Sequence, residues 1–366
     1  MDSSMASRLI RSMLVICFAC GWPIFGAAEM QIAIQKVQIA DGIYQFMSAP
    51  DGFVPDDNSI VIVNENDVLV FDTFTRPSSA RTLLAEIRKI TDKPVRYVVN
   101  SHHHPDHWSG NEVFAEAFPN IEIISTEESR RYMVNIAKSW PPVWTNNLKK
   151  SQDAFDKEVN SGKDAEGKPL TAEQRHEDEN DLLLLKDWVG ELKNTKRTYP
   201  TLTYTDQLIL RHGGREFRFM SVMGDATGTT VLYLPKEKVL VTGDTISFPI
   251  PKSNSNLPLS QLEKSLRKLS QLDVDVIIPG HGAAMRDKNL LTLEADLIAS
   301  VTSQVNAAEE QGAVTVEDMQ KVVNVDSFRP KFTHGDKDLN EQFQTSVNSM
   351  VDNASREARD GRKWQF

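Results

Sequence analysis

The sequence predicts an α/β fold, because strand-like and helix-like segments alternate along most of the chain. The strand-like segments are short runs of apolar and β-branched residues, of which 68–71 and 95–99 are typical. The helix-like segments carry apolar residues three or four positions apart, as Leu83, Ile87 and Ile90 do. A chain of 366 residues that are 40% hydrophobic can also bury a large core, as one domain with insertions or as two domains. This alternation is typical of layered α/β architectures.

In the first half of the chain, four strands are expected before the first helix. The third and fourth are joined by Asn64-Glu65-Asn66-Asp67, a polar sequence typical of a hairpin turn. The predicted strands are 32–39, 42–47, 60–63, 68–71, 95–99 and 121–124, and the predicted helices are 77–91, 112–117 and 126–138.

Residues 140–198 interrupt this alternation and predict a helical insertion. The stretch is highly charged, and 162–169 form a break rich in glycine, lysine and aspartate. Thr171 and Gln174 have the spacing of a capping box, which predicts a helix to about residue 192. Aromatic and proline residues, which often line the mouth of a site, cluster at the entry: Trp140, Pro141, Pro142 and Trp144. The insertion is therefore expected to form a wall over a site, the alternative being a solvated pair of helices.

The second half returns to strands and then ends in helices. Gly213 and Gly214 predict a hairpin turn between two strands. The predicted strands are 207–211, 216–222, 229–234, 238–241 and 275–278, and the predicted helices are 258–272, 290–309, 316–323 and 339–356. Three segments follow from the whole pattern: a leader at 1–28, a core domain at 29–285 that contains the insertion, and a C-terminal helical extension at 286–366.

The first 28 residues have the pattern of a secretory signal peptide. Arg8 and Arg11 precede an apolar run at 12–25, and small residues follow for a cleavage after Ala28. The run is short for a membrane span, although an uncleaved anchor or a lipoprotein at Cys20 are alternatives. The sequence therefore predicts a periplasmic or secreted protein with no stable membrane span after cleavage.

Both cysteines, Cys17 and Cys20, lie in this leader. The chain that follows it offers no thiol for a disulfide, for a soft metal or for nucleophilic catalysis. The net charge of −10 argues against nucleic acid and against an anionic membrane surface as partners. A small molecule is the expected partner, and the oligomeric state stays open.

The main functional signal lies in the loop 101–111, directly after the predicted strand 95–99. Four potential metal ligands fall within six residues: His102, His104, Asp106 and His107. Asp244 and His281 also follow directly after strand-like runs. Because α/β proteins assemble sites from loops at strand ends, these side chains are expected to meet.

These features, in this order, resemble the metallo-β-lactamase-fold hydrolase superfamily, including its glyoxalase II-like members. The matching segments are Phe71-Asp72-Thr73, His102-His-His-Pro-Asp-His107, Gly224-Asp-Ala-Thr-Gly228, Val231-Leu-Tyr-Leu-Pro235, Thr242-Gly-Asp244 and Pro279-Gly-His-Gly282. The resemblance implies an αββα sandwich, with two mixed sheets face to face, helices outside and a metal site at one sheet edge.

The resemblance also implies the ligands of two divalent metal ions. They are His102 and His104 for the first ion, Asp106, His107 and His281 for the second, and Asp244 as a bridge. Asp72 would organise the loop and bind no metal. Asp106 would also act in catalysis, by orienting the nucleophile.

One position departs from the family pattern. Where the family supplies a third histidine to the first metal, this chain has Asp225. A carboxylate is a legitimate zinc ligand, but a hard, charged oxygen makes iron or manganese more competitive. The expected cofactor is therefore a pair of Zn²⁺ ions, with iron or manganese as alternatives, and a first site that Asp225 does not complete is a further alternative.

Two close divalent ions suit hydrolysis, because they lower the pKa of a shared water and polarise the bond that breaks. The expected function is thus an exported hydrolase that acts on an ester, lactone, thioester or amide bond. A β-lactamase is one alternative. The other is a mononuclear iron oxygenase or redox protein of the same fold, because Asp225 and Asp244 with one histidine resemble a His/carboxylate iron site.

The remaining histidines are expected to lie outside the site. His103 should point away from it, and His176, His212 and His334 are expected on a helix, in a turn and at the surface. Trp108 is expected either in a pocket wall or in the core.

Overall fold

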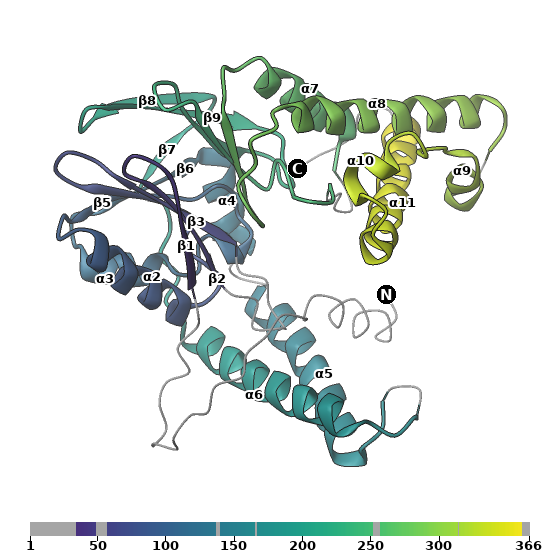
Figure 1. Cartoon of the computed structure of the whole chain (residues 1–366), viewed down its shortest axis with the longest axis horizontal. Helices are drawn as coiled ribbons and strands as arrows, with labels where there is room; N and C mark the ends of the chain where they lie inside the picture. Colours follow the sequence, from purple (N-terminus) through teal and green to yellow (C-terminus); the bar gives the residue numbers. More distant parts are fainter. Residues whose placement is uncertain are drawn as a thin grey trace.

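The computed structural model describes residues 34–48, 57–136, 140–164, 167–251, 257–313 and 315–360. These residues form two β-sheets that pack face to face, with helices outside both of them (Figure 1). The predicted αββα fold is therefore confirmed. The predicted signal peptide at 1–28 lies outside the described residues.

The first sheet has seven strands in the order of the chain. Its strands are β1 (Ile34–Ala40), β2 (Ile43–Ser48), β3 (Asn58–Val63), β4 (Val68–Phe71), β5 (Val95–Val99), β6 (Glu122–Thr126) and β7 (Leu202–Tyr204). The strands β1 to β4 pair antiparallel, and β4 to β7 pair parallel. The three-residue β7 was not predicted, because its pairing with β6 defines it and it is too short for a hydrophobic period.

The second sheet has five strands in the order β12-β11-β10-β9-β8. Its strands are β8 (Gln207–His212), β9 (Arg215–Val222), β10 (Thr229–Leu234), β11 (Val239–Gly243) and β12 (Val276–Pro279). Only β11 and β12 pair parallel, so this sheet, like the first, is mixed.

Side chains on alternate strand positions build the separate layers, because a strand presents successive residues to opposite faces. Ile60 and Ile62 of β3 face the interior between the sheets, together with Leu232 of β10, whereas Val61 packs on the opposite face. Burying these apolar side chains from water is the main force that holds the two sheets together.

Helices cover the outer faces of both sheets. On the first sheet lie α2 (Pro77–Ile90) and α3 (Asn111–Ala117), and α4 (Glu127–Ile136) contacts β6 and β7. The 3₁₀ turn η1 (Pro105–His107) lies in the histidine loop. On the second sheet lie α7 (Leu259–Ser270) and α8 (Asn289–Glu310), followed by α9 (Val316–Val322), α10 (Arg329–Thr333) and α11 (Lys337–Asp360). The short α10 was not predicted.

The insertion is a helical hairpin of α5 (Trp140–Ser161) and α6 (Ala172–Asn194), which extends away from the two sheets (Figure 1). The capping box at Thr171 and Gln174 is present as predicted. Buried Arg76 ties the hairpin to the core through ion pairs with Asp187 and Glu191 of α6. The side chains of 140–148 lie outside the described set, so the wall over the site stays a prediction.

The last helix contacts the segment that follows Asp244. The Ser346 hydroxyl of α11 donates to the carbonyl of Pro251, and the Asn353 side chain accepts from the Leu257 amide at 3.3 Å. The helical extension therefore packs against Pro251 and Leu257, which follow Asp244 in the chain.

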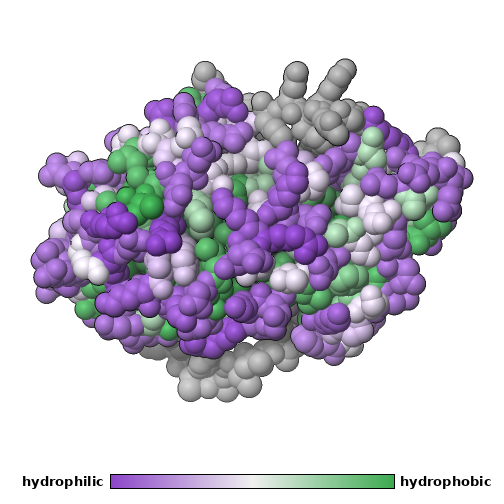
Figure 2. All heavy atoms as spheres, turned by 90° about the horizontal axis from the view of Figure 1, so that it is seen from above, coloured by the Kyte–Doolittle hydropathy of each residue, from purple (hydrophilic) through white to green (hydrophobic). Residues whose placement is uncertain are grey.

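The described residues include no helix that is both long and apolar enough to span a membrane. On the face shown in Figure 2, hydrophilic residues dominate and hydrophobic ones form separate small spots. That face therefore resembles an ordinary solvated surface.

Candidate metal centre

The predicted site residues come from loops at one edge of the two sheets. The histidine loop follows β5, Asp225 follows β9, Asp244 follows β11 and His281 follows β12. Backbone hydrogen bonds join these loops, from the Asp225 amide to the Asp244 carbonyl at 3.0 Å and from the Gly280 amide to the Gly243 carbonyl at 2.8 Å. The sheets thus bring together side chains that lie far apart in sequence.

Buried polar side chains fix the shape of the histidine loop. The Asn100 side chain donates to the His107 carbonyl at 3.1 Å, and Asn111 donates to the Asn100 side-chain oxygen at 2.8 Å. A Cβ atom at Gly110 would lie 2.0 Å from the Thr73 carbonyl oxygen, so only glycine fits there. These contacts therefore fix the backbone path of the loop.

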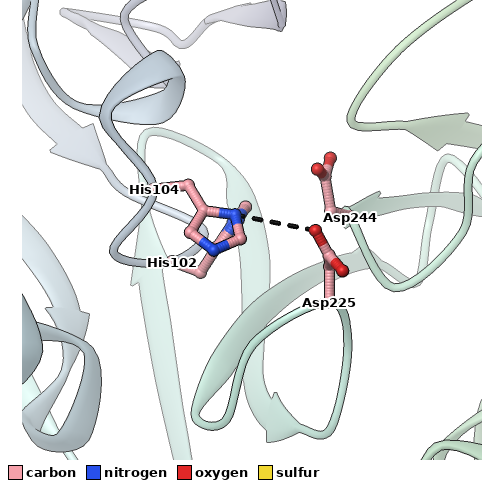
Figure 3. Close-up of side chains that lie close together, drawn as sticks. All are labelled: His102, His104, Asp225 and Asp244. Atoms are coloured by element: carbon pink, nitrogen blue, oxygen red, sulfur yellow. Dashed lines mark hydrogen bonds and ion pairs between the residues drawn. The ribbon is translucent and has the colours of Figure 1, made fainter. Parts of the chain in front are cut away.

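The first group of potential ligands is His102, His104, Asp225 and Asp244, whose ligand atoms all lie within 4.8 Å of one another. Figure 3 shows the two histidines on one side and the two aspartates on the other, with His104 directed toward Asp225. The Nε2 atom of His102 lies 2.8 Å from Nδ1 of His104, which lies 3.6 Å from Oδ2 of Asp225. These nitrogen and carboxylate atoms converge on one point, as the ligands of a single ion must.

The second group is Asp106, His107, Asp244 and His281. The Oδ2 atom of Asp106 lies 3.4 Å from Nε2 of His107 and 3.4 Å from Nε2 of His281. Asp244 belongs to both groups, and its Oδ2 atom is 3.4 Å from Nε2 of His281. A Cβ atom at Gly280 would lie 1.8 Å from Oδ1 of Asp244, so this glycine makes room for the shared carboxylate.

A third group, Asp57, Asp72 and His107, lies behind the second. The Oδ2 atom of Asp72 is 2.9 Å from Nδ1 of His107, and its Oδ1 atom accepts from the Ser101 amide at 2.6 Å. Asp72 also has a positive φ of 62°, which turns the chain at the end of β4. The geometry agrees with the expected role of Asp72 in organising the loop.

Burial and neighbouring charges shift the pKa values of these side chains in opposite directions. Burial by itself would raise the pKa of the Asp106 carboxyl, but His107 and His281 beside it hold that pKa well below its usual range. Burial would lower the pKa of His107, but Asp106, Asp244 and Asp72 raise it well above its usual value. A positive charge is thus favoured among these carboxylates, and a divalent cation would supply it.

The residues present fit a pair of divalent ions. The Nε2 atom of His107 and the Oδ1 atom of Asp244 are buried and have no hydrogen-bond partner within the described part of the chain. Such atoms are costly in a folded protein unless something binds them. The donors are imidazole nitrogens and carboxylate oxygens, a set that suits zinc, iron or manganese.

The structure brings together all seven predicted ligands, in two groups that share one aspartate. Their role in binding metal stays a prediction. Sequence reasoning missed Asp57, which follows no strand and belongs to no motif segment. Asp57 and Asp72 are both buried and both face His107. The one sequence signal for Asp57 is an acidic residue shortly before a predicted strand.

The remaining histidines lie away from the two groups, as expected. His103 stacks on Tyr132 with ring centroids 4.9 Å apart, and burial lowers its pKa to about 3. His212 pairs with Asp67, and His334 is exposed. Trp108 is buried and donates to the His103 carbonyl at 2.9 Å, which places it in the core, the second of its two expected positions.

The chain matches one known protein family over more than half of its length. A model of the metallo-beta-lactamase superfamily matches residues 54–281, a range that contains both groups of potential ligands. The chain belongs to the metallo-beta-lactamase superfamily. This membership confirms the family and the metallo-hydrolase class that the motifs predicted.

One relative of this chain is an alkylsulfatase. A linear primary-alkylsulfatase from Pseudomonas sp. (strain ATCC 19151) is 26% identical over 273 residues, which are 70% of this chain and 48% of that protein. The chain thus spans about half the length of this relative.

Two solved structures of the metallo-beta-lactamase superfamily have a similar fold. The stereoselective inverting sec-alkylsulfatase Pisa1 from Pseudomonas sp. covers 91% of this chain and 52% of its own, with 16% identity and a TM-score of 0.56. The metallo-beta-lactamase from Pontibacter korlensis covers 72% of this chain and 98% of its own, with 15% identity and a TM-score of 0.50.

Asp225, at the position where the family pattern implied a histidine, provides a direct test of the first group. Asp225→Ala is expected to weaken binding of the first ion and to leave the second in place, because Asp225 belongs to the first group alone. Asp225→His is expected to raise the preference for zinc over manganese, since imidazole favours zinc. Competitive titration of the metal-free protein with a chromophoric chelator measures both effects.

Asp206→Ala, at an exposed aspartate, is the matched control for this pair of variants. An unchanged number of ions and unchanged affinities in Asp225→Ala would contradict a ligand role for Asp225.

Proposed function

We propose that this chain is a hydrolase that uses two divalent ions to cleave the sulfate ester of an alkyl alcohol. The observation that carries the proposal is the pair of ligand groups joined by Asp244. A carboxylate shared by both groups would hold two ions close together, as two-metal hydrolysis requires. Zinc is the proposed metal, with iron and manganese as the alternatives that Asp225 favours.

Two bound divalent ions would supply Lewis acidity and would lower the pKa of a water molecule between them. The protein side chains then have to orient that water and the ester. Asp106 is suited to this task, because its side chain is 27% exposed whereas that of His107 is fully buried. An anionic carboxylate at this position can accept a hydrogen bond from water and hold it toward the ester.

Sequence similarity favours an alkyl sulfate as the substrate. The relative that shares sequence with 70% of this chain is a linear primary-alkylsulfatase. A sulfate ester is also an ester with an anionic group, which two cations can bind and polarise. In this reaction water adds its oxygen to one side of the C–O–S linkage, and the products are an alcohol and hydrogen sulfate.

The decisive experiment combines metal analysis with a substrate panel. The purified protein is stripped with chelator, reloaded with zinc, and given octyl sulfate, a secondary alkyl sulfate, a nitrophenyl ester, a lactone and a cephalosporin. We expect about two ions per chain, and sulfate release that disappears on stripping and returns with metal. Hydrolysis of the cephalosporin alone would replace the proposal by a β-lactamase, and one iron per chain with oxygen consumption would replace it by an oxygenase.

We also propose that the protein is exported to the periplasm or the medium, on the basis of the leader pattern at 1–28. Mass spectrometry of the protein from fractionated cells is expected to find a mature N-terminus at Glu29. An intact leader on cytoplasmic protein would contradict this.

A further inference from the structure

Asp57, directly before β3, and Asn58, its first residue, lie against His107 and against the loop that carries His281. Asp57 is fully buried, and its Oδ2 atom lies 3.3 Å from Nδ1 of His107. This nitrogen is on the side of the imidazole away from Nε2, which faces Asp106 and Asp244. Asp57 therefore lies beside the His107 ring on the side opposite the proposed metal ion.

Asn58 holds the loop that carries His281. Its side-chain amide donates to the carbonyl of Pro279 at 2.8 Å and to the carbonyl of Gly282 at 2.7 Å. Its backbone amide donates to the carbonyl of Gly280 at 2.6 Å. The residues on both sides of His281 are thus fixed by one asparagine, which is itself buried.

We propose that Asp57 and Asn58 are positioning residues that set the affinity of the second metal ion. Asp57 would orient the His107 ring and keep its Nε2 lone pair toward the ion, and Asn58 would hold His281 at the matching distance. Carboxylates that hold the far nitrogen of a ligating histidine have this role in metal sites, and their loss typically costs about 10–100-fold in metal affinity. The inference rests on the proposed dinuclear function and extends it to residues outside the ligand groups.

The contacts favour this supporting role over a third metal ion among Asp57, Asp72 and His107. Asp72 is already hydrogen-bonded on both oxygens, to Nδ1 of His107 at 2.9 Å and to the Ser101 amide at 2.6 Å. A third ion bound to Nδ1 of His107 would have to break the hydrogen bond between that nitrogen and Asp72. The hydrogen bond from the Ser101 amide to the other oxygen of Asp72 would stay as it is. Nδ1 of His107 faces both carboxylates and already has Asp72 as its hydrogen-bond partner, so it is not available to a third ion.

The test measures the two metal affinities separately in the full-length protein. Metal-free protein is titrated with Zn²⁺ against a chromophoric chelator, and with Co²⁺ while its visible absorption is recorded. For Asp57→Asn and Asp57→Ala we expect the dissociation constant of the second ion to rise about 10–100-fold, with the first ion bound as before. The cobalt spectrum of the second ion should change with it, because the orientation of an imidazole ligand alters the metal's ligand field.

Asn58→Ala is expected to give the same selective loss through His281. Asp67→Asn is the matched control, since it removes a carboxylate that faces His212, a histidine outside the two groups. Unfolding midpoints measured in chelator show whether each variant is folded. Should Asp57→Ala fail to fold, Asp57→Asn, which preserves the side-chain shape, decides the question.

Two ions bound with unchanged affinity and unchanged cobalt spectrum in both Asp57 variants would overturn this inference and leave the proposed function standing. Three ions per unaltered chain would also overturn it, because the third would occupy the position of the supporting carboxylates. Fewer than two ions in the unaltered protein would overturn the proposed function and the inference with it.

Discussion

Replacement of Asp244 by asparagine is expected to abolish nearly all hydrolysis and to leave fewer than one tightly bound metal ion per chain. Asp244 belongs to both ligand groups, so its loss weakens both ions, whereas the loss of Asp225 or His281 weakens one. We expect the rate to fall on the order of 10³-fold, or about 4 kcal/mol of transition-state stabilisation. Metal content by plasma emission and sulfate release from octyl sulfate measure the two effects together.

The matched control for this substitution is Asp273→Asn, at an exposed aspartate that pairs with Lys238. Asparagine has nearly the shape of aspartate, so the unfolding midpoint in chelator should change little. An Asp244→Asn protein that still bound two ions and hydrolysed its substrate at a tenth of the original rate or faster would contradict the bridging role.

Replacement of Glu294 by glutamine is expected to remove a large pH dependence of stability. Glu294 lies on α8 among the apolar side chains that cover the second sheet, and its Oε2 atom has no hydrogen-bond partner within the described residues. Burial raises the pKa of its carboxyl to about 8 from an ordinary value of 4.5. The folded state therefore keeps a proton that the unfolded chain releases near pH 4.5.

The proton that Glu294 keeps in the folded state sets the direction in which stability changes with pH. Between the two pKa values the folded state binds more protons than the unfolded state, so the free energy of unfolding falls as pH rises and levels off above about pH 8. From pH 5 to pH 8 the loss attributable to Glu294 is about 3 kcal/mol. Urea unfolding of the metal-free protein at both pH values should show this loss in the unaltered protein and not in Glu294→Gln.

Glu310→Gln, at an exposed glutamate on the same helix, is the control for that experiment. The same pH dependence in the unaltered protein and in Glu294→Gln would show that the Glu294 carboxyl is not held neutral by burial.

Most of the fold and of the candidate site could be predicted from the sequence, because the informative residues repeat or cluster. Continuous runs of apolar and β-branched residues placed strands such as β10 (Thr229–Leu234) at their observed bounds. The four potential ligands of the histidine loop lie within six residues, and Asp244 and His281 each follow a recognisable apolar run. Because α/β proteins assemble sites from loops at strand ends, these loops were expected to meet, and they do.

The features that the sequence did not predict depend on tertiary contacts, which leave no local pattern in the sequence. β7 (Leu202–Tyr204) and α10 (Arg329–Thr333) are too short to display a period, and they exist through their neighbours. Asp57 and Asn58 read as polar residues before a strand. Their importance appears only when β3 lies beside both the histidine loop and the His281 loop.

The sequence by itself thus determined the fold family and most of the potential ligands, because these depend on residue types at short spacings or at strand ends. The division of the ligands into two groups around Asp244 was implied by the resemblance to that family. The tertiary structure decided which side chains stand behind the ligands, because that depends on how two sheets close on each other over 224 residues between Asn58 and Gly282. Burial and directional hydrogen bonds at that closure place Asp57 against His107 and Asn58 against the His281 loop.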